Sequence, residues 1–279
     1  MFRIACWLIV ASAAVTFAQE RETSADLPGV RLWYRDTGGR GVPIVLIHAN
    51  TGSSRVWEYQ LPVFVKNGFR VIVYDRRGFG RSVIDPAGAQ PGTGADDLQG
   101  LMTHLGIDRF HLVGTAGGAF VAIDYALSFP ARLRSLVIAS SIGGVQDEEF
   151  VAMGRRLRPS PQFESLPPEV REVGPAYRAA NPDGTRRWVE LEKISRPPGP
   201  VAAQTLRNRL TLAKLEDINM PTLLLTGGAD LFAPPAIQQM FKAHIRLAET
   251  LAVPDAGHSL YWEQPEVFNR AVLVFIRKR

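Results

Sequence analysis

The stretch that decides the fold is residues 110–129, which read FHLVGTAGGAFVAIDYALSF. Its first four residues, 110–113, are largely apolar, as in a strand that is buried on both faces. Its second half, 118–129, has the apolar content of a helix and stops before Pro130, which cannot continue one. Small residues fill the join at 114–118, where the chain has to turn sharply. The stretch therefore predicts a buried strand that passes directly into a helix.

Further segments of both kinds lie on either side of this stretch. The predicted strands are residues 44–47, 71–74, 110–113, 136–139, 223–225 and 250–253, and the predicted helices include 57–67, 96–105, 118–129 and 265–277. Strands without polar alternation are buried on both faces, so we expect a doubly wound α/β domain whose mostly parallel sheet is flanked by helices. Residues 30–35 alternate more and predict an antiparallel edge strand, and Gly38 to Gly41 predict a hairpin turn.

The spacing of the strands locates an insertion. The predicted strands 136–139 and 223–225 are much further apart than the ~30 residues that a strand–helix–strand unit needs. We expect residues 143–213 to form a small, mainly helical cap over the carboxyl ends of the strands, where open parallel sheets bind ligands. The core would then consist of 27–142 and 214–279. A disordered linker is the alternative, but the inserted residues are too rich in large apolar side chains to favour one.

The N-terminus has the features of a secretory signal peptide. Arg3 precedes an apolar stretch that ends at Ala18, and Thr16 and Ala18 suit the −3 and −1 positions of signal peptidase. We expect residues 1–18 to be removed and the protein to be exported to the periplasm or the extracellular space, with no membrane span left. An uncleaved anchor is the alternative, although about fifteen apolar residues are short for a span that needs ~20. Cleavage would remove Cys6, the single cysteine.

Composition and spacing argue against several function classes. The chain carries 32 Lys and Arg against 27 Asp and Glu, a formal net charge of +5, and the basic residues are scattered instead of gathered in a run. That pattern argues against nucleic-acid binding. One cysteine and five dispersed histidines provide no set of metal ligands, and the glycines at 114–118 lack the G-x-G-x-x-G spacing of a dinucleotide site. We therefore expect a small-molecule substrate, no cofactor and no metal.

Five short motifs follow the predicted strands. They are HANTG at 48–52, DRRGFGRS at 75–82, GTAGG at 114–118, TGGAD at 226–230 and DAGHS at 255–259. Together they resemble the α/β-hydrolase family, whose nucleophile elbow reads G-x-S-x-G and is followed along the chain by an acid and a histidine. The resemblance covers nearly the whole mature chain. It implies an α/β-hydrolase fold with a cap, and a hydrolase that acts on an ester, a lactone or a related carbonyl compound.

The resemblance also implies roles for particular residues. His258 would be the acid–base histidine, and Asp230 would orient it. The backbone N–H groups of Asn50 and Gly117 would form the oxyanion hole. The sequence departs from the family at the nucleophile position, because it has Ala116 where the motif has serine. A methyl group cannot attack a carbonyl carbon.

Three hypotheses account for Ala116. In the first, the chain is a serine hydrolase whose nucleophile was replaced deliberately to trap a substrate. In the second, it is a natural enzyme in which the histidine–aspartate pair deprotonates water or an acidic substrate without a covalent step. In the third, it is a catalytically inactive ligand-binding protein on the same fold. Thr115 is a poor replacement nucleophile because it should point away from the cleft, and the family places neither Ser82 nor Ser259 in attack geometry.

The inserted residues suggest what the substrate contacts. Phe150, Phe163 and Trp188 favour a mostly hydrophobic substrate. Four arginines of the same segment are candidates to contact a carboxylate, although such residues usually lie in solvent: Arg155, Arg156, Arg186 and Arg187. The expected substrate is therefore a small, uncharged or anionic carbonyl compound with apolar groups.

Overall fold

The structure is a computed structural model of the chain, and it describes residues 21–85, 92–158, 160, 162–197 and 204–279. The predicted signal peptide, with Cys6, lies outside the described residues. Within the described residues, no helix combines the length and the apolar character needed to cross a membrane.

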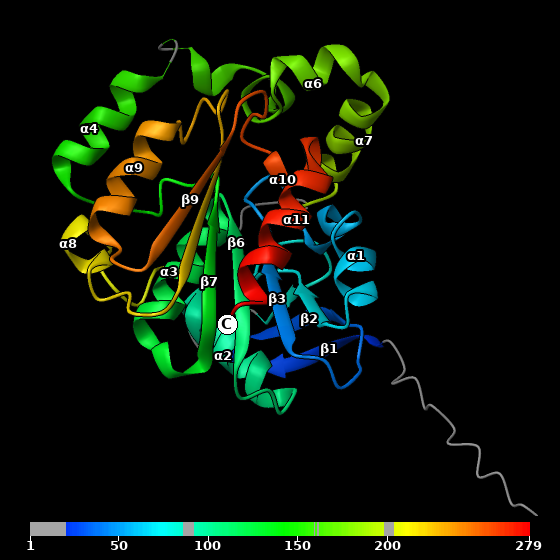
Figure 1. Cartoon of the computed structure of the whole chain (residues 1–279). Coiled ribbons are helices and arrows are strands. Elements are labelled where there is room, and N and C mark those ends of the chain that lie inside the picture. Colours follow the sequence, from blue (N-terminus) through cyan, green and yellow to red (C-terminus); the bar gives the residue numbers. More distant parts are fainter. Residues whose placement is uncertain (1–20, 86–91, 159, 161, 198–203) are drawn as a thin grey trace, which may run out of the picture.

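A nine-stranded sheet forms the centre of the molecule (Figure 1). Its strands are β1 (Arg21–Leu27), β2 (Val30–Asp36), β3 (Pro43–Ile47), β4 (Arg70–Tyr74), β5 (Val83–Ile84), β6 (Phe110–Thr115), β7 (Leu133–Ala139), β8 (Thr222–Gly227) and β9 (Ala248–Val253). Their order is β1-β2-β4-β3-β6-β7-β8-β9, and β5 pairs with β2. The strands from β4 to β9 in this order are parallel, whereas β1, β2 and β5 pair antiparallel. All six predicted apolar strands are present, which confirms the mostly parallel sheet.

Two expectations about the start of the chain are wrong. β2 is not an edge strand, because all seven of its residues pair with β1. The hairpin turn lies between these two strands at Gly29, whose φ of 70° suits glycine best. Gly38 to Gly41 instead connect β2 to β3, which pairs in parallel with β4 and β6. The hydrophobic pattern did not reveal β1 because only Ala25 of its residues is buried.

Helices flank both faces of the sheet (Figure 1). One face carries α2 (Gly94–His104), α3 (Gly117–Ser128), α4 (Glu148–Leu157), α8 (Leu212–Leu215) and α9 (Pro235–His244), and the other carries α1 (Leu61–Lys66), α10 (Leu260–Glu263) and α11 (Pro265–Ile276). Single 3₁₀ turns lie at Ser54–Trp57, Pro130–Arg132 and Phe163–Ser165. Each face has its own buried apolar cluster, and removal of that surface from water, at ~25 cal/mol per Å², is the main favourable contribution to folding.

Five helices of the described residues lie between β7 and β8. Four of them are α4, α5 (Pro168–Glu172), α6 (Pro175–Ala180) and α7 (Pro182–Lys193), and the fifth, α8, lies on the same face of the sheet as α9. α4 packs beside α9, where the rings of Phe150 and Phe241 stack with their centroids 5.9 Å apart. α6 and α7 lie beyond one end of the sheet (Figure 1), and Trp188 of α7 donates its Nε1–H to Ser259 Oγ at 3.1 Å, past the end of β9. α6 and α7 therefore lie at the carboxyl ends of the strands, whereas α4 flanks the sheet beside α9, and the exact boundaries of core and cap stay a prediction.

The motif at 75–82 fixes the loop after β4. Asp75 is buried, and its Oδ1 accepts the N–H of Ser54 at 2.7 Å. Arg77 forms a buried ion pair with Asp97 of α2 at 2.7 Å. Asp75 therefore holds the segment of Ser54 against this loop, and Arg77 holds α2 against it. Arg76 lies between these two residues in sequence and takes part in neither contact.

Candidate active site

Residues 114–118 form a sharp turn between β6 and α3. Ala116 has φ 48° and ψ −119°, a backbone conformation that costs a residue with a side chain on the order of 1–3 kcal/mol. Close packing explains the glycines around it, since a Cβ on Gly118 would lie 2.4 Å from the carbonyl oxygen of Ile47. The methyl group of Ala116 borders a cavity. The turn therefore has the strained strand-to-helix geometry of an elbow, with a methyl group at its tip.

Asp230 and His258 lie side by side although they are 28 positions apart in the sequence. Asp230 follows β8 and His258 follows β9, and these strands are neighbours in the sheet. The Nδ1 atom of His258 is 2.9 Å from each carboxylate oxygen of Asp230. Asp230 Oδ1 also accepts the N–H groups of Phe232 and Ala233, both at 2.8 Å. The carboxylate is thus fixed by its own loop and holds the imidazole in one orientation.

Surrounding acids set the charge of His258. Burial lowers the pKa of His258, but the charge and hydrogen bond of Asp230, followed by the charges of Glu172 and Glu263, outweigh burial and raise this pKa to about 9. At neutral pH both ring nitrogens therefore carry protons. Since Nδ1 is bound to Asp230, the Nε2–H group is the one available to a bound molecule.

The loop after β3 brings Asn50 against the strand-to-helix turn. A Cβ on Gly117 would lie 2.4 Å from Asn50 Oδ1, so the two residues are in contact. Among the described residues, neither the N–H of Asn50 nor that of Gly117 has a hydrogen-bond acceptor. His48 shapes the loop, because it is buried and its Nε2 accepts the N–H of Arg76 at 3.0 Å. Two amide donors are therefore free beside the turn, as an oxyanion hole requires.

A cavity of about 230 Å³ lies over the methyl group of Ala116. The residues that line it include Asn50, Ala116, Gly117, Glu172, Phe232 and His258. Four of the five residues singled out by the family resemblance therefore border one cavity, and the fifth, Asp230, lies directly behind His258. In the part of the chain that the structure describes, no cluster of three His, Cys, Asp or Glu side chains could hold a metal ion.

Glu172, at the end of α5, borders the same cavity, and no sequence motif marks it. Its Oε2 atom is 3.9 Å from Nε2 of His258, and its carbonyl oxygen accepts the N–H of Ser259 at 2.8 Å. Burial is the largest cause that raises the pKa of Glu172. The imidazole therefore has a buried carboxyl group on each side, one from the loop after β8 and one from α5.

A second cavity, of about 250 Å³, shares Asn50 and Gly117 with the first and is lined by Arg76 and Arg196. Arg76 Nη2 donates to Asn50 Oδ1 at 2.7 Å, and Arg196 Nη2 donates to the carbonyl oxygen of Asn50 at 3.0 Å. Both guanidinium groups lie over the ring of Phe79, 4.4 and 4.8 Å from its centroid. Burial lowers the pKa of Arg76 to about 10. Two cations therefore border this cavity, and although neither forms an ion pair within the described ranges, Arg196 lies near enough to Glu192 to lower the pKa of that carboxyl group.

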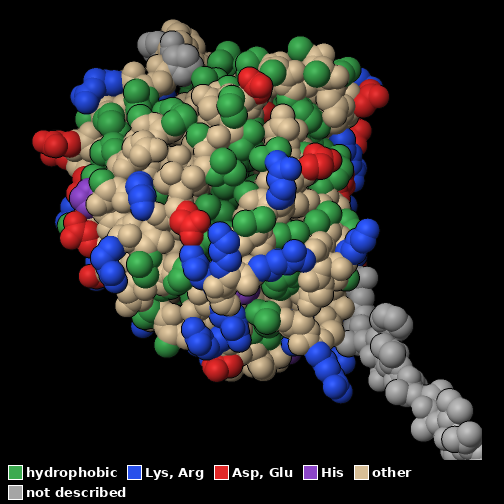
Figure 2. Space-filling view, in the orientation of Figure 1, with side chains coloured by type: hydrophobic (Ala, Val, Ile, Leu, Met, Phe, Trp, Pro, Cys, Tyr) green, Lys and Arg blue, Asp and Glu red, His purple; other side chains and the backbone are tan. Residues whose placement is uncertain are grey.

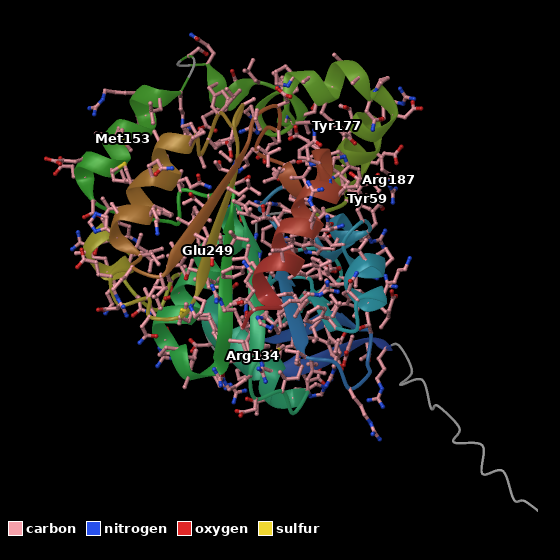
Figure 3. The ribbon with its side chains drawn as sticks, viewed as in Figure 1. Tyr59, Arg134, Met153, Tyr177, Arg187 and Glu249 are labelled. Carbon is pink, nitrogen blue, oxygen red and sulfur yellow. The ribbon has the colours of Figure 1, made fainter. Side chains whose placement is uncertain are left out.

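The arginines that the sequence suggested for substrate contact lie elsewhere. Arg186 pairs with Asp183, and Arg187 pairs with Glu58, beside Tyr59 at the outer surface of α7 (Figure 3). On the face drawn in Figure 2, Lys and Arg side chains are interspersed with hydrophobic side chains and with Asp and Glu. None of the four predicted arginines lines either cavity: Arg155, Arg156, Arg186 and Arg187.

The three aromatic residues that suggested a mostly hydrophobic substrate pack inside the protein. Phe163 is buried against Phe232, with ring centroids 4.9 Å apart, while Phe150 and Trp188 pack the inserted helices onto the core. None of these three lines the cavity over Ala116, where Phe232 and Ile142 supply apolar surface instead. These large aromatic residues therefore pack the insertion onto the core, and they do not identify the substrate.

Comparison with known proteins extends these observations. A family model described as the alpha/beta hydrolase family matches residues 44–271. A 2-hydroxy-6-oxononadienedioate/2-hydroxy-6-oxononatrienedioate hydrolase from Burkholderia vietnamiensis is 28% identical, over 89% of this chain and 92% of that protein. The malate-bound structure of a thermophilic esterase from Thermogutta terrifontis has 30% identity and a TM-score of 0.75, over 94% of this chain and 99% of that one. A solved N-acyl homoserine lactone degrading enzyme has 25% identity and a TM-score of 0.72, over 90% and 99%.

Proposed function

The chain belongs to the alpha/beta hydrolase family, and from that membership we propose that it hydrolyses a carboxylate-bearing ester, lactone or related carbonyl compound. Water attacks the carbonyl carbon directly in this proposal, and no acyl-enzyme forms. The proposal rests on the Asp230–His258 pair, whose imidazole borders the same cavity as Ala116, Asn50 and Gly117. Among the described residues, the backbone N–H groups of Asn50 and Gly117 have no hydrogen-bond acceptor.

This arrangement suits the steps of hydrolysis that need no nucleophilic side chain. The N–H groups of Asn50 and Gly117 can bind the oxygen that becomes negative as water adds to the carbonyl carbon. His258 can exchange a proton with the reacting oxygen atoms, while Asp230 stabilises its charged form. In serine hydrolases that lose a triad residue, binding and the oxyanion hole alone still leave a rate ~10³–10⁴-fold above that in water. A methyl group at position 116 is therefore compatible with catalysis.

Two hydroxyl groups near the site are engaged in other bonds. Ser141 borders the cavity, but its Oγ donates to the carbonyl oxygen of Ala116 at 2.8 Å and accepts the N–H of Gly143 at 3.0 Å. Ser259 Oγ accepts the Nε1–H of Trp188. A side-chain nucleophile needs a base within hydrogen-bond reach, and neither hydroxyl bonds to the imidazole of the site. These engagements favour water as the nucleophile.

Arg76 and Arg196 support a substrate that carries a carboxylate. They border the cavity next to the site, and guanidinium groups bind carboxylates through charge-assisted hydrogen bonds. The relative from Burkholderia vietnamiensis is named as a hydrolase of dienedioates, a name that specifies two carboxylates, and the esterase from Thermogutta terrifontis was solved with malate bound. We extend the same preference for acidic compounds to this chain.

A ligand-binding protein without turnover is the second candidate. The methyl group of Ala116 favours it, because the family's covalent route is closed. The Asp230–His258 pair favours turnover instead, because a binding site gains nothing from a histidine that is oriented by a buried carboxylate. The two candidates make different predictions about the effect of removing His258.

A panel of esters and lactones, each with and without an additional carboxylate, tests the proposal. We expect the wild-type chain to hydrolyse acidic members of the panel and His258→Ala to lower kcat/KM by about 10²–10⁴-fold, the usual contribution of an acid–base group. His244→Ala is the matched control, because His244 lies at the surface and pairs with Glu216. It should leave turnover unchanged.

The Ala116→Ser variant and mass spectrometry of quenched reactions separate the remaining hypotheses. The wild-type chain should show no acyl adduct during turnover. Turnover confined to the Ser variant, with an acyl adduct, would contradict the proposal and indicate a serine hydrolase that has lost its nucleophile. Ligand binding without turnover in both forms would favour the binding protein.

A further inference from the structure

Glu172 is a buried carboxyl group that the Asp230–His258 pair does not account for. Its Oε2 atom lies 3.9 Å from Nε2 of His258, whereas Asp230 binds Nδ1 on the other side of the ring. It also borders the cavity over Ala116. A carboxyl group in this place lies next to both the proton of Nε2 and the space where a carbonyl compound would react.

Contacts between α5 and the loop of His258 fix the position of Glu172. The carbonyl oxygen of Glu172 accepts the N–H of Ser259 at 2.8 Å. Glu263 Oε2 accepts the N–H of Gly257 at 2.8 Å, and a Cβ on Gly174 would lie 2.5 Å from that same oxygen. The residues just before His258 and just after Glu172 are therefore packed together around one acid, so the carboxyl group of Glu172 is held beside the ring.

The separation of the two groups suits a single bridging water. At 3.9 Å, the Oε2 of Glu172 and the Nε2 of His258 are too far apart for a direct hydrogen bond. A water about 2.8 Å from each atom would bond to both at once. Because both residues border the cavity over Ala116, that water would lie beside the site of a bound carbonyl carbon.

Charges around the two groups determine which one holds the proton. The charged groups that face them are Asp230 and Glu263 from the core and Arg171 from α5. Burial lowers the pKa of His258 but the acids raise it to about 9, and burial raises the pKa of Glu172 above its ordinary value. His258 is protonated below about pH 9, and its charge is the largest cause that lowers the pKa of Glu172, which favours the carboxylate form of that side chain. Nε2 is then a proton donor, and Glu172 is the acceptor.

We propose that Glu172 is the general base of this site and His258 its general acid. The inference rests on the proposed function and assigns its two proton transfers to two residues. Glu172 takes a proton from water as the water oxygen bonds to the carbonyl carbon, and the carbonyl electron pair moves onto the oxygen held by Asn50 and Gly117. The electron pair on that oxygen then re-forms the carbonyl bond, the bond to the leaving oxygen breaks, and the leaving oxygen takes the proton from Nε2. Glu172 then passes its proton to Nε2, so one water is consumed and both groups are restored.

Glu172→Gln tests the assignment, because the amide keeps the shape of the side chain and cannot accept the proton. We expect kcat to fall by about 10²–10⁴-fold. The wild-type rate should fall below the pKa of Glu172, where the base is protonated, and above pH ~9, where His258 loses its proton. The Gln variant should lose the acidic limb. Glu169→Gln, on the same helix but partly exposed, is the matched control and should keep the wild-type rate and profile.

Two further measurements do not depend on the same readout. The pKa of His258, followed by NMR of the imidazole, should fall by about one unit in Glu172→Gln, because a facing negative charge is removed. Formate should restore part of the turnover of Glu172→Ala, since a free carboxylate can occupy the vacated space. A merely structural role would predict neither the pKa change nor the rescue, and thermal unfolding followed by circular dichroism reports whether each variant folds.

The possible outcomes separate this inference from the proposed function. If Glu172→Gln keeps the wild-type rate while His258→Ala loses it, Glu172 is not the base and the proposed function stands. If Glu172→Gln loses activity but shows an unchanged pH profile and an unchanged pKa of His258, the assignment is also wrong. If the wild-type chain turns over no member of the panel, both proposals fail together.

Discussion

At residue 116 the backbone is held at φ 48°, in a region that a residue with a side chain rarely adopts. The restraint comes from its neighbours. A Cβ on Gly114 would lie 2.7 Å from the Cα of Ala119, and a Cβ on Gly118 would lie 2.4 Å from the carbonyl oxygen of Ile47. α3 therefore lies so close to β3 and β6 that the packing restricts the backbone conformation of the turn. Residue 116 keeps the strained conformation although its side chain is a methyl group and carries no hydroxyl.

Gly118→Ala tests this restraint on a single residue. The added methyl group would meet backbone atoms that cannot move independently, so we expect the free energy of unfolding to fall by about 3 kcal/mol. Gly154→Ala is the control, because an added Cβ there meets nothing within 4 Å and the residue lies inside α4. It should stabilise the protein by up to ~1 kcal/mol. Urea unfolding followed by circular dichroism measures both, and equal midpoints for Gly118→Ala and wild type would refute the close packing.

Among the elements, what could be predicted depends on how much of each is buried. The parallel strands were found because they are apolar on both faces, whereas β1 presents a single buried residue. Asn50 and His258 could be predicted through the family resemblance, because they stand in motifs that follow strands, and the carboxyl ends of parallel strands meet at one edge. Glu172 and Arg196 come from segments between β7 and β8 whose path over the sheet leaves no periodic pattern, and α5 is only five residues long. Their positions depend on tertiary contacts that no local pattern encodes.

Arg196, in the segment after α7, allows a test of the second cavity as a carboxylate site. The side chain of Arg196 is exposed, so its replacement leaves no empty space in the core. It borders the cavity next to the active site. For a carboxylate-bearing substrate we expect Arg196→Gln to raise KM about tenfold with little change in kcat, because the lost charge acts on binding alone. A neutral ester should show no change. Arg186→Gln, whose side chain is 70% exposed, is the control, and an equal loss with acidic and neutral substrates would contradict a carboxylate subsite.

Across the whole molecule, the site is assembled from parts that are distant in sequence. Loops after β3, β6, β8 and β9 supply Asn50, the strand-to-helix turn, Asp230 and His258. These strands are parallel, so their loops meet at one edge, and α5 reaches that edge through its bond to Ser259. A change in how the inserted helices pack would therefore move Glu172 relative to His258 and leave the Asp230–His258 pair in place.

The start of the sheet bears on the proposed export of the protein. Signal peptidase would cut after Ala18, so we expect the exported chain to begin at Gln19. β1 begins at Arg21, so this cut leaves every described strand whole, and the cleaved chain should unfold at the same urea concentration as the uncleaved one. It should also contain no thiol, because Cys6 is removed. N-terminal sequencing and thiol titration of protein from the periplasm or the medium check both points, and a chain that starts at Met1 and retains one thiol would indicate an uncleaved anchor.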